Sequence, residues 1–189
     1  MTIESLSRGV APCPPSSNFR WAWVGVENGT AVAVLTAALR LEEERTDPPF
    51  PECARVEFVY SMRSGWGAQL ARHASTALSK SHGLTLYRSG YATAAGWNLL
   101  ARRVKMEIDP LAIYQHSHYL DTLERWQDHA SRQPPRTNMP APQPPIRPYD
   151  PKSAKQKGRE ILVTAASYLS LPVPEQTANS ADDTTIDRR

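Results

Sequence analysis

The chain has few cysteines, no long apolar run and little net charge, and each shortage excludes a class of protein. Its two cysteines, Cys13 and Cys53, cannot form the dense disulfide framework of a small secreted domain, so we expect a reducing, cytoplasmic compartment. A Cys13–Cys53 bridge stays open at this point. No run of about 18 apolar residues occurs, so no span of a bilayer is expected. Residues 1–15 have no apolar signal-peptide core, which argues against secretion.

The formal net charge of +3 is too small to predict binding to nucleic acid or to an anionic membrane. Seventeen prolines among 189 residues, many of them between positions 134 and 151, predict segments that do not pack. The composition therefore favours one compact domain with extensions. We expect a flexible arm over 1–18, the compact domain over 19–105, a helical extension over 106–131, a Pro-rich linker over 132–154, an amphipathic helix over 155–171 and a disordered tail over 172–189.

Two apolar runs between residues 19 and 39 are separated by Asn28-Gly29. This dipeptide tolerates positive φ at both central positions of a type I′ turn, so the segment predicts a β-hairpin. Residues 41–51 are acidic and then Pro-rich, and prolines cannot continue a strand, so we expect an exposed loop.

The stretch from Arg55 to Gly83 organises the rest of the chain. β-Branched and aromatic residues predict a buried strand up to Ser61, the glycines that follow predict a tight turn, and apolar residues at helical spacing predict a helix ending at Gly83. A helix that begins at a glycine turn presents unpaired N–H groups and a positive dipole end. Gly65 and Gly67 would let an anion approach these amides beside Arg63; the alternative is a tight connection with no ligand.

The order of strand, glycine turn, helix and second strand over Val56–Leu70 and Leu84–Tyr87 resembles the acyl-CoA-binding core of the GNAT family of N-acetyltransferases. Gly65 and Gly67 match the two small positions of that family's turn. Residues 88–97 resemble a strand end and helix start found in actinobacterial members. The resemblance, over roughly residues 19–104, implies an α/β fold: a mixed sheet with an N-terminal antiparallel hairpin and a βαβ core, plus C-terminal helices.

The same resemblance implies an enzyme that uses acetyl-CoA as co-substrate and transfers the acetyl group directly to an amine. The turn would hold the pyrophosphate, and backbone N–H groups near Val59 would polarise the thioester carbonyl. Glu57 is the candidate base, if partial burial raises its pKa, and Tyr91 the candidate acid; the alternative for Glu57 is a pair with Arg55. The expected cofactor-binding residues are Val59, Tyr60, Ser61, Arg63, Ser64, Gly65, Trp66, Gly67 and Ala68.

A second hypothesis is a non-catalytic protein that keeps this fold for interaction or regulation. Met62 stands where the family has Arg or Gln, and the family's final strands are not visible, which favours this alternative. Partners would then bind the helices expected at 110–131 and 155–171. A second copy of the chain could also cover the sheet edge that missing strands would leave. His116 and His118 lie two residues apart on a helix and point in different directions, so no metal site is expected. The acceptor amine, small molecule or protein, is open.

Overall fold

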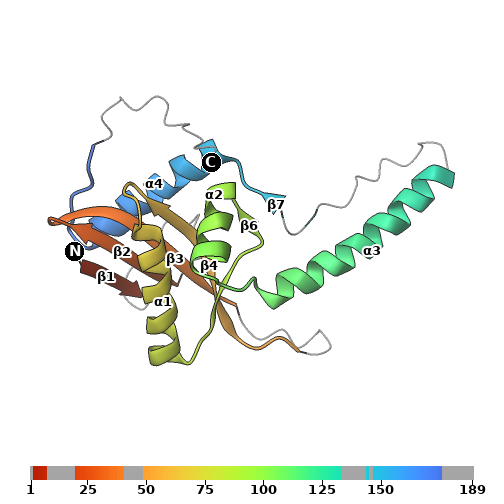
Figure 1. Ribbon diagram of the computed structural model, residues 1–189, viewed down its shortest axis with the longest axis horizontal. Coiled ribbons are helices and arrows are strands. Elements are labelled where there is room, and N and C mark those ends of the chain that lie inside the picture. Colours follow the sequence, from red (N-terminus) through yellow and green to blue (C-terminus); the bar gives the residue numbers. More distant parts are fainter. Residues whose placement is uncertain (1, 8–19, 41–48, 133–143, 145–146, 176–189) are drawn as a thin grey trace, which may run out of the picture.

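The computed structural model describes residues 2–7, 20–40, 49–132, 144 and 147–175. These residues form a mixed α/β fold around a five-stranded sheet in the order β1-β2-β3-β4-β5, shown in Figure 1. The strands β1 to β4 are antiparallel neighbours, and β5 runs parallel to β4. The strands are β1 (Thr2–Ser7), β2 (Trp21–Glu27), β3 (Thr30–Arg40), β4 (Cys53–Ser61) and β5 (Leu86–Arg88).

The predicted hairpin is confirmed: β2 and β3 are joined by a turn in which Asn28 has φ 52° and Gly29 has φ 73°. Both values lie in the left-handed region that a type I′ turn needs. The expectation of a flexible arm over 1–18 is wrong for its first residues. Thr2–Ser7 pairs with β2 as the edge strand β1, whereas residues 8–19 lie outside the described part of the chain.

The strand, turn and helix at the centre of the chain are also confirmed. Helix α1 (Trp66–His82) begins after Gly65 and ends at Gly83, whose φ of 67° and N–H bonds to the last turn make it the C-terminal cap. The next strand starts at Leu86 rather than Leu84. Together β4, α1 and β5 form the expected βαβ unit with parallel strands.

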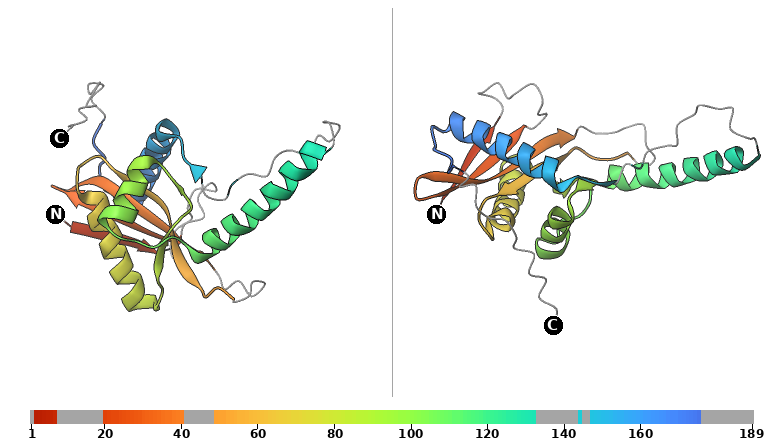
Figure 2. Two further views of the ribbon diagram at one scale, coloured as in Figure 1. Left: turned by 45° about the vertical axis from the view of Figure 1, so that its right-hand side comes forward. Right: turned by 90° about the horizontal axis from the view of Figure 1, so that it is seen from above.

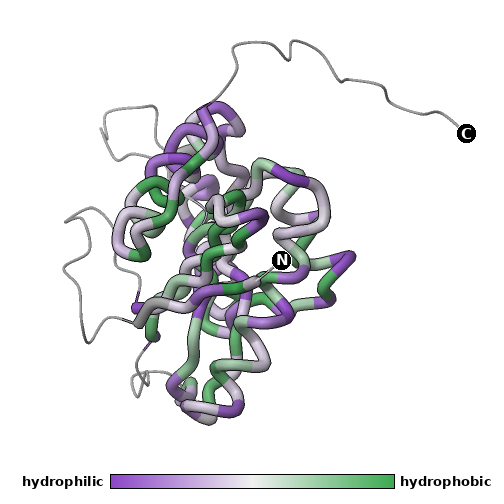
Figure 3. The backbone as a smooth tube through the Cα atoms, turned by 90° about the vertical axis from the view of Figure 1, so that its left-hand side faces the viewer, coloured by the Kyte–Doolittle hydropathy of each residue, from purple (hydrophilic) through white to green (hydrophobic). Residues whose placement is uncertain are grey.

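One face of the sheet packs against α1 and the helical segment that follows β5. That segment contains α2 (Ala94–Trp97), whose N-cap is Thr93, and continues as a π-helix over Asn98–Arg103. The core on this face joins strand residues such as Trp23 and Leu35 to Leu70 of α1 and Leu100 of the π-helix. In Figure 3 the hydrophobic stretches accordingly gather in the middle of the molecule.

The opposite face of the sheet is covered by α4 (Pro151–Tyr168), as Figure 2 shows from above. Leu162, Ala165 and Ala166 of this helix pack on Val24 and Val34. The expectation that 132–154 is an unpacked linker is therefore wrong for its last residues. The strand β7 (Arg147–Pro148) pairs with β6 (Tyr91–Ala92), and α4 starts four residues before the predicted position.

The segment after α4 is likewise held to the domain, contrary to the disordered tail expected from residue 172. The Pro172 carbonyl accepts the N–H of Ala31 at 2.8 Å, and the Pro174 carbonyl accepts from Arg159 at 3.3 Å. Residues 176–189 of the expected tail, residues 133–143 of the expected linker and residues 41–48 of the expected acidic loop lie outside the described residues.

Helix α3 (Pro110–Arg132) confirms the predicted extension and projects from the body of the molecule in both views of Figure 2. Its start is fixed by Asp109, which is 1% exposed, accepts the Leu111 N–H at 3.0 Å and lies 3.2 Å from Nε of Arg40. A carboxylate at this position caps the helix. Within the described residues, no helix has both the length and the apolar character needed to cross a membrane.

Replacing Asp150 with alanine is expected to lower the melting temperature at pH 7 by loosening the start of α4. The Asp150 carboxylate accepts from the Ser153 hydroxyl at 2.6 Å and from its N–H at 2.8 Å, and these bonds hold the pKa of Asp150 below its ordinary 3.8. A lowered native pKa means that the cap stabilises the fold above that value and loses its effect as the pH falls through the native pKa.

The measurement is a series of melting curves for the wild type and the alanine variant from pH 7 down to pH 3. Asp150→Asn is the control, because its side-chain oxygen still accepts from the backbone but does not titrate. The difference between wild type and alanine variant should shrink at the acid end. A constant difference across the series would show that Asp150 does not act through its carboxylate.

Candidate functional site

A β-bulge in β4 sets the geometry of the candidate site. Phe58 pairs with Thr36 of β3, whereas Val56 pairs with the next residue of β3, Ala37. Glu57 is therefore an extra residue without an opposite partner on β3. Such a bulge disrupts the ladder locally and reverses which residues face each side of the strand.

After the bulge, backbone groups of β4 point toward an open edge. The Met62 N–H donates to the Val32 carbonyl of β3 at 2.9 Å. Because hydrogen bonding alternates along an antiparallel strand, the N–H of Tyr60 also faces β3, and those of Val59 and Ser61 face the other side. On that side β5 pairs with β4 only as far as Val56, so no strand of the described chain meets these two N–H groups.

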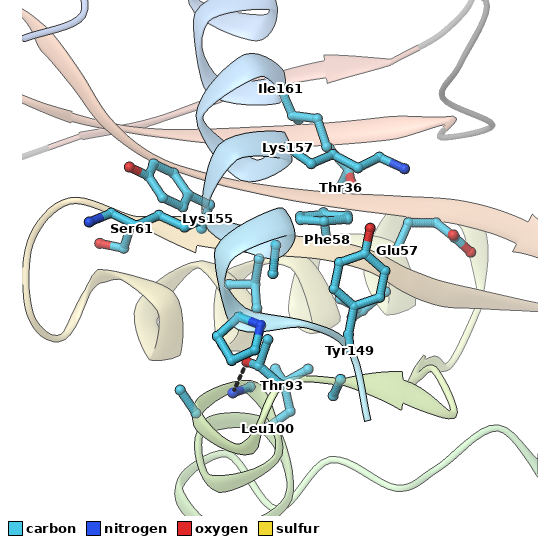
Figure 4. A pocket seen from close by; sticks show the side chains of 18 of the residues that line it. Thr36, Glu57, Phe58, Ser61, Thr93, Leu100, Tyr149, Lys155, Lys157 and Ile161 are labelled. Atoms are coloured by element: carbon cyan, nitrogen blue, oxygen red, sulfur yellow. Dashed lines mark hydrogen bonds between the residues drawn. The ribbon is translucent and has the colours of Figure 1, made fainter. Parts of the chain in front are cut away.

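The divergence of β4 and β5 opens into a pocket of about 1010 Å³. Figure 4 shows its walls: strand β4, with Glu57 and Ser61 toward opposite ends, α4 with Lys155 and Lys157, and the segment that carries Thr93 and Leu100. We call the end beside Val56, where the two strands still pair, the closed end, and the end beside Ser61 the open end.

The pocket brings together six of the predicted site residues. Three are consecutive residues of β4, one follows that strand, one is the extra residue of the bulge and one belongs to β6. They are Val59, Tyr60, Ser61, Arg63, Glu57 and Tyr91. The side chain of Arg63 is 66% exposed and lies 3.7 Å from the Glu27 carboxylate.

The other predicted residues, Ser64 to Ala68, do not line this pocket. The backbone conformation and the packing of the turn explain why three of them are glycine or tryptophan. Gly65 is the N-cap of α1 with φ 85°, a left-handed conformation that favours glycine. A Cβ on Gly67 would lie 2.7 Å from the Leu99 side chain. Trp66 is 1% exposed and belongs to the core. The structure thus gives Trp66 a packing role, and phosphate binding by this turn stays a prediction.

Glu57 forms the ion pair that the sequence left as the alternative to catalysis. Its Oε1 accepts from Nε of Arg55 at 3.0 Å and from Nη2 at 2.8 Å, and both side chains are about one-third exposed. The pair lines the pocket rather than the outer surface. An arginine that holds one carboxylate oxygen leaves the second oxygen for another partner, so the pair fixes the orientation of Glu57 without blocking it.

Sequence reasoning missed Tyr149, which it placed in the Pro-rich linker. The Tyr149 N–H donates to the Ala92 carbonyl at 3.0 Å, and its ring meets Phe58 edge-on at 6.1 Å between centroids. Figure 4 shows its side chain standing in the pocket in front of β4. No local pattern could have indicated this position, because it depends on the pairing of β6 with β7. Tyr149 joins Tyr91 as a hydroxyl-bearing residue of the pocket.

The one described cysteine is not suited to covalent catalysis. Cys53 is a buried, free thiol at the start of β4, and burial raises its pKa. A thiol with a raised pKa is a poor nucleophile. Among the described residues no three His, Cys, Asp or Glu side chains are grouped closely enough to hold a metal ion.

The arrangement brings the Glu57 carboxylate, the tyrosines Tyr91 and Tyr149 and two outward-facing backbone N–H groups to one cleft, which Tyr60 and Glu175 also line. It could bind an extended chain along β4 and carry out proton transfer at the closed end. Comparison with protein-family models, with curated proteins and with solved structures found no match to this chain.

Proposed function

We propose that the protein is an acetyl-CoA-dependent N-acyltransferase of the GNAT type that transfers the acyl group directly to an amine. The observation that supports this most is the fork between β4 and β5, into which the N–H groups of Val59 and Ser61 point. The pantetheine arm of coenzyme A is extended and contains amides. It could pair with this edge in the way that a peptide adds a strand to a sheet.

Acetyl-CoA, when bound, supplies the activated acyl group. The Val59 N–H would donate to the acyl carbonyl oxygen and stabilise the negative charge that develops there. Glu57, held by Arg55, would accept the proton that the amine loses, directly or through a water molecule. Tyr149 or Tyr91 would give a proton to the departing sulfur. The bond between carbonyl carbon and nitrogen forms, and the bond between carbonyl carbon and sulfur breaks.

The phosphates of the cofactor would lie at the open end, where the described chain offers two attractive features. Arg63 lines the pocket there. The helix α1 begins nearby, and its first N–H groups have no side-chain cap. Cation and helix terminus together favour an anion.

Acetyl-CoA is expected to bind saturably in isothermal titration, and Val59→Pro is expected to weaken that binding by about tenfold or more. Proline removes the N–H that faces the pocket but breaks no hydrogen bond to β3. The ligand group that this N–H would bind is then left unpaired, which accounts for a tenfold loss of affinity. Val59→Ala is the matched control, because it trims the same side chain but keeps the N–H. Absence of binding at millimolar acetyl-CoA would overturn the proposal, as would equal weakening by both variants.

A second candidate function is partner binding without catalysis, and the exposure of α3 favours it. This helix leaves the body of the molecule (Figure 1) and exposes about half the surface of Ile113 and Leu120. Exposed apolar side chains on one helix are typical of surfaces that contact another protein. This function replaces the first if acetyl-CoA does not bind.

A further inference from the structure

The charged side chains of the pocket are mostly cationic. Five cations line it against two carboxylates. The cations are Arg55, Arg63, Arg88, Lys155 and Lys157, and the carboxylates are Glu57 and Glu175. Arg63, at the open end, is accounted for by the cofactor's phosphates under the proposed function. The charge at the closed end needs another explanation, because the acyl group that would reach it is neutral.

At the closed end Arg55 is already paired with Glu57, and the other cation there is Arg88. It is the last residue of β5 and pairs with Val56 where the two strands separate. Its Nε donates to the Met106 carbonyl at 3.1 Å, and its guanidinium lies 4.0 Å from the centroid of the Trp97 ring. These contacts fix the position of the guanidinium in the pocket wall.

No carboxylate of the described residues forms an ion pair with Arg88. Its pKa is lowered by burial alone, yet a guanidinium stays protonated at neutral pH. A partly desolvated cation without a counterion is costly, and the cost is recovered when an anion binds. The planar fork of arginine matches the two oxygens of a carboxylate or phosphate.

The two carboxylates of the pocket do not offset this charge. Glu57 is already paired with Arg55. Glu175 lies toward the open end. It follows Pro172, whose carbonyl accepts the N–H of Ala31, and Ala31 adjoins the part of β3 that pairs with the open end of β4. Among the described residues, a polycationic amine would therefore find no unpaired carboxylate at the closed end.

A second cation lies on the facing wall. Lys157 of α4 has its ammonium 5.5 Å from the centroid of the Phe58 ring, and Phe58 adjoins Glu57 in the sequence. An acceptor that places its amine near Glu57 would thus have Arg88 on one side and Lys157 on the other. Both would attract a negatively charged group on that acceptor.

We propose that the acceptor is an amine that carries an oxyanion, a carboxylate or a phosphate, which Arg88 binds at the closed end of the pocket. That the ligand is an acyl acceptor rests on the proposed function, whereas the oxyanion site itself does not depend on acyl transfer. It predicts amino-acid-like or phosphorylated amines rather than polyamines.

The experiment measures binding to the full chain, without acetyl-CoA, by isothermal titration of matched pairs of probes. The carboxylate arm compares N-acetylated α-amino acids with their primary amides, and the phosphate arm compares O-phosphoethanolamine with ethanolamine. In at least one arm the anionic member is expected to bind at least tenfold more tightly than its neutral partner, and the arm that shows this identifies the oxyanion. Spermidine is expected not to bind measurably.

Arg88→Met should reduce this preference to nearly one, and Arg102→Met is the control, because Arg102 is exposed on the π-helix and does not line the pocket. Lys157→Gln changes an exposed side chain that the fold does not need. It should lower the preference severalfold even if Arg88→Met fails to fold. The inference is wrong if neutral members bind as tightly as anionic ones, if no member binds, or if spermidine is preferred.

The titration with acetyl-CoA separates the two proposals. If acetyl-CoA binds but no oxyanion preference is found, this inference fails and acyl transfer stands. If an oxyanion preference is found but acetyl-CoA does not bind, the anion site stands and acyl transfer fails.

Discussion

Glu57→Gln is expected to lower the kcat of acyl transfer by about 10²- to 10⁴-fold with acetyl-CoA affinity nearly unchanged, because general base catalysis contributes a factor of that size. Glutamine has the same shape and can still accept a hydrogen bond from Arg55, which holds the native carboxylate at 2.8 Å. It cannot take up a proton from the amine. The measurement is the initial rate of thiol release from acetyl-CoA in the presence of the free amine that corresponds to the preferred anionic probe, which is an α-amino acid or O-phosphoethanolamine.

Two further variants distinguish catalysis from a structural ion pair. Arg55→Met keeps the carboxylate and removes its partner, so it should reduce the rate much less than Glu57→Gln does. Glu107→Gln, an exposed change outside the pocket, should leave the rate unaltered. Glu57 would serve in the ion pair alone if two results were found together. The wild type and Glu57→Gln would have equal rates, and the Glu57 and Arg55 variants would show similar losses of melting temperature.

Trp66→Ala is expected to reduce the free energy of unfolding by about 3–5 kcal/mol, the range for removing a fully buried large aromatic side chain. Trp66 is 1% exposed, and the absence of a side chain at Gly25 makes room for its ring. A Cβ at Gly25 would lie only 2.5 Å from Cε3 of Trp66. The cavity left by alanine cannot close without moving α1 against β2. Urea unfolding followed by circular dichroism gives the difference.

Trp126→Ala is the matched control, because Trp126 lies half-buried on the projecting helix α3 and should lower the stability much less. The sequence placed Trp66 among the cofactor-binding residues. If Trp66→Ala left the stability within 1 kcal/mol of the wild type and abolished acetyl-CoA binding, that assignment would be right, and its burial in the core would not be its main role.

Local signals in the sequence sufficed for the central elements of the fold. Asn28-Gly29 predicts the hairpin because so few residues accept positive φ at two successive positions, and Gly83 predicts the end of α1 for the same reason. The edge strand Thr2–Ser7 gave no such signal. Its only half-buried side chain among those described is Ile3, so it lacks the apolar alternation by which a strand is recognised.

The candidate site was predicted only in part, because its geometry depends on pairing between distant segments. Glu57 was singled out, but the bulge at Glu57 follows from its register against β3, and no property of β4 alone reveals it. Tyr149 enters the pocket because β7 pairs with β6 across more than fifty residues of sequence. A proline-rich composition suggested a linker there, although proline is tolerated at the first turn of a helix, where α4 uses Pro151.

The position of α4 has a consequence for the order in which the protein can fold as it is synthesised. The strand residues Val24 and Val34 are made early, and the helix that buries them is made more than one hundred residues later. Until residues 151–168 leave the ribosome, one face of the nascent sheet lacks its cover, and an uncovered apolar face is prone to aggregate. The same late helix also supplies a wall of the pocket, so the binding site is complete only after α4 has docked on the sheet.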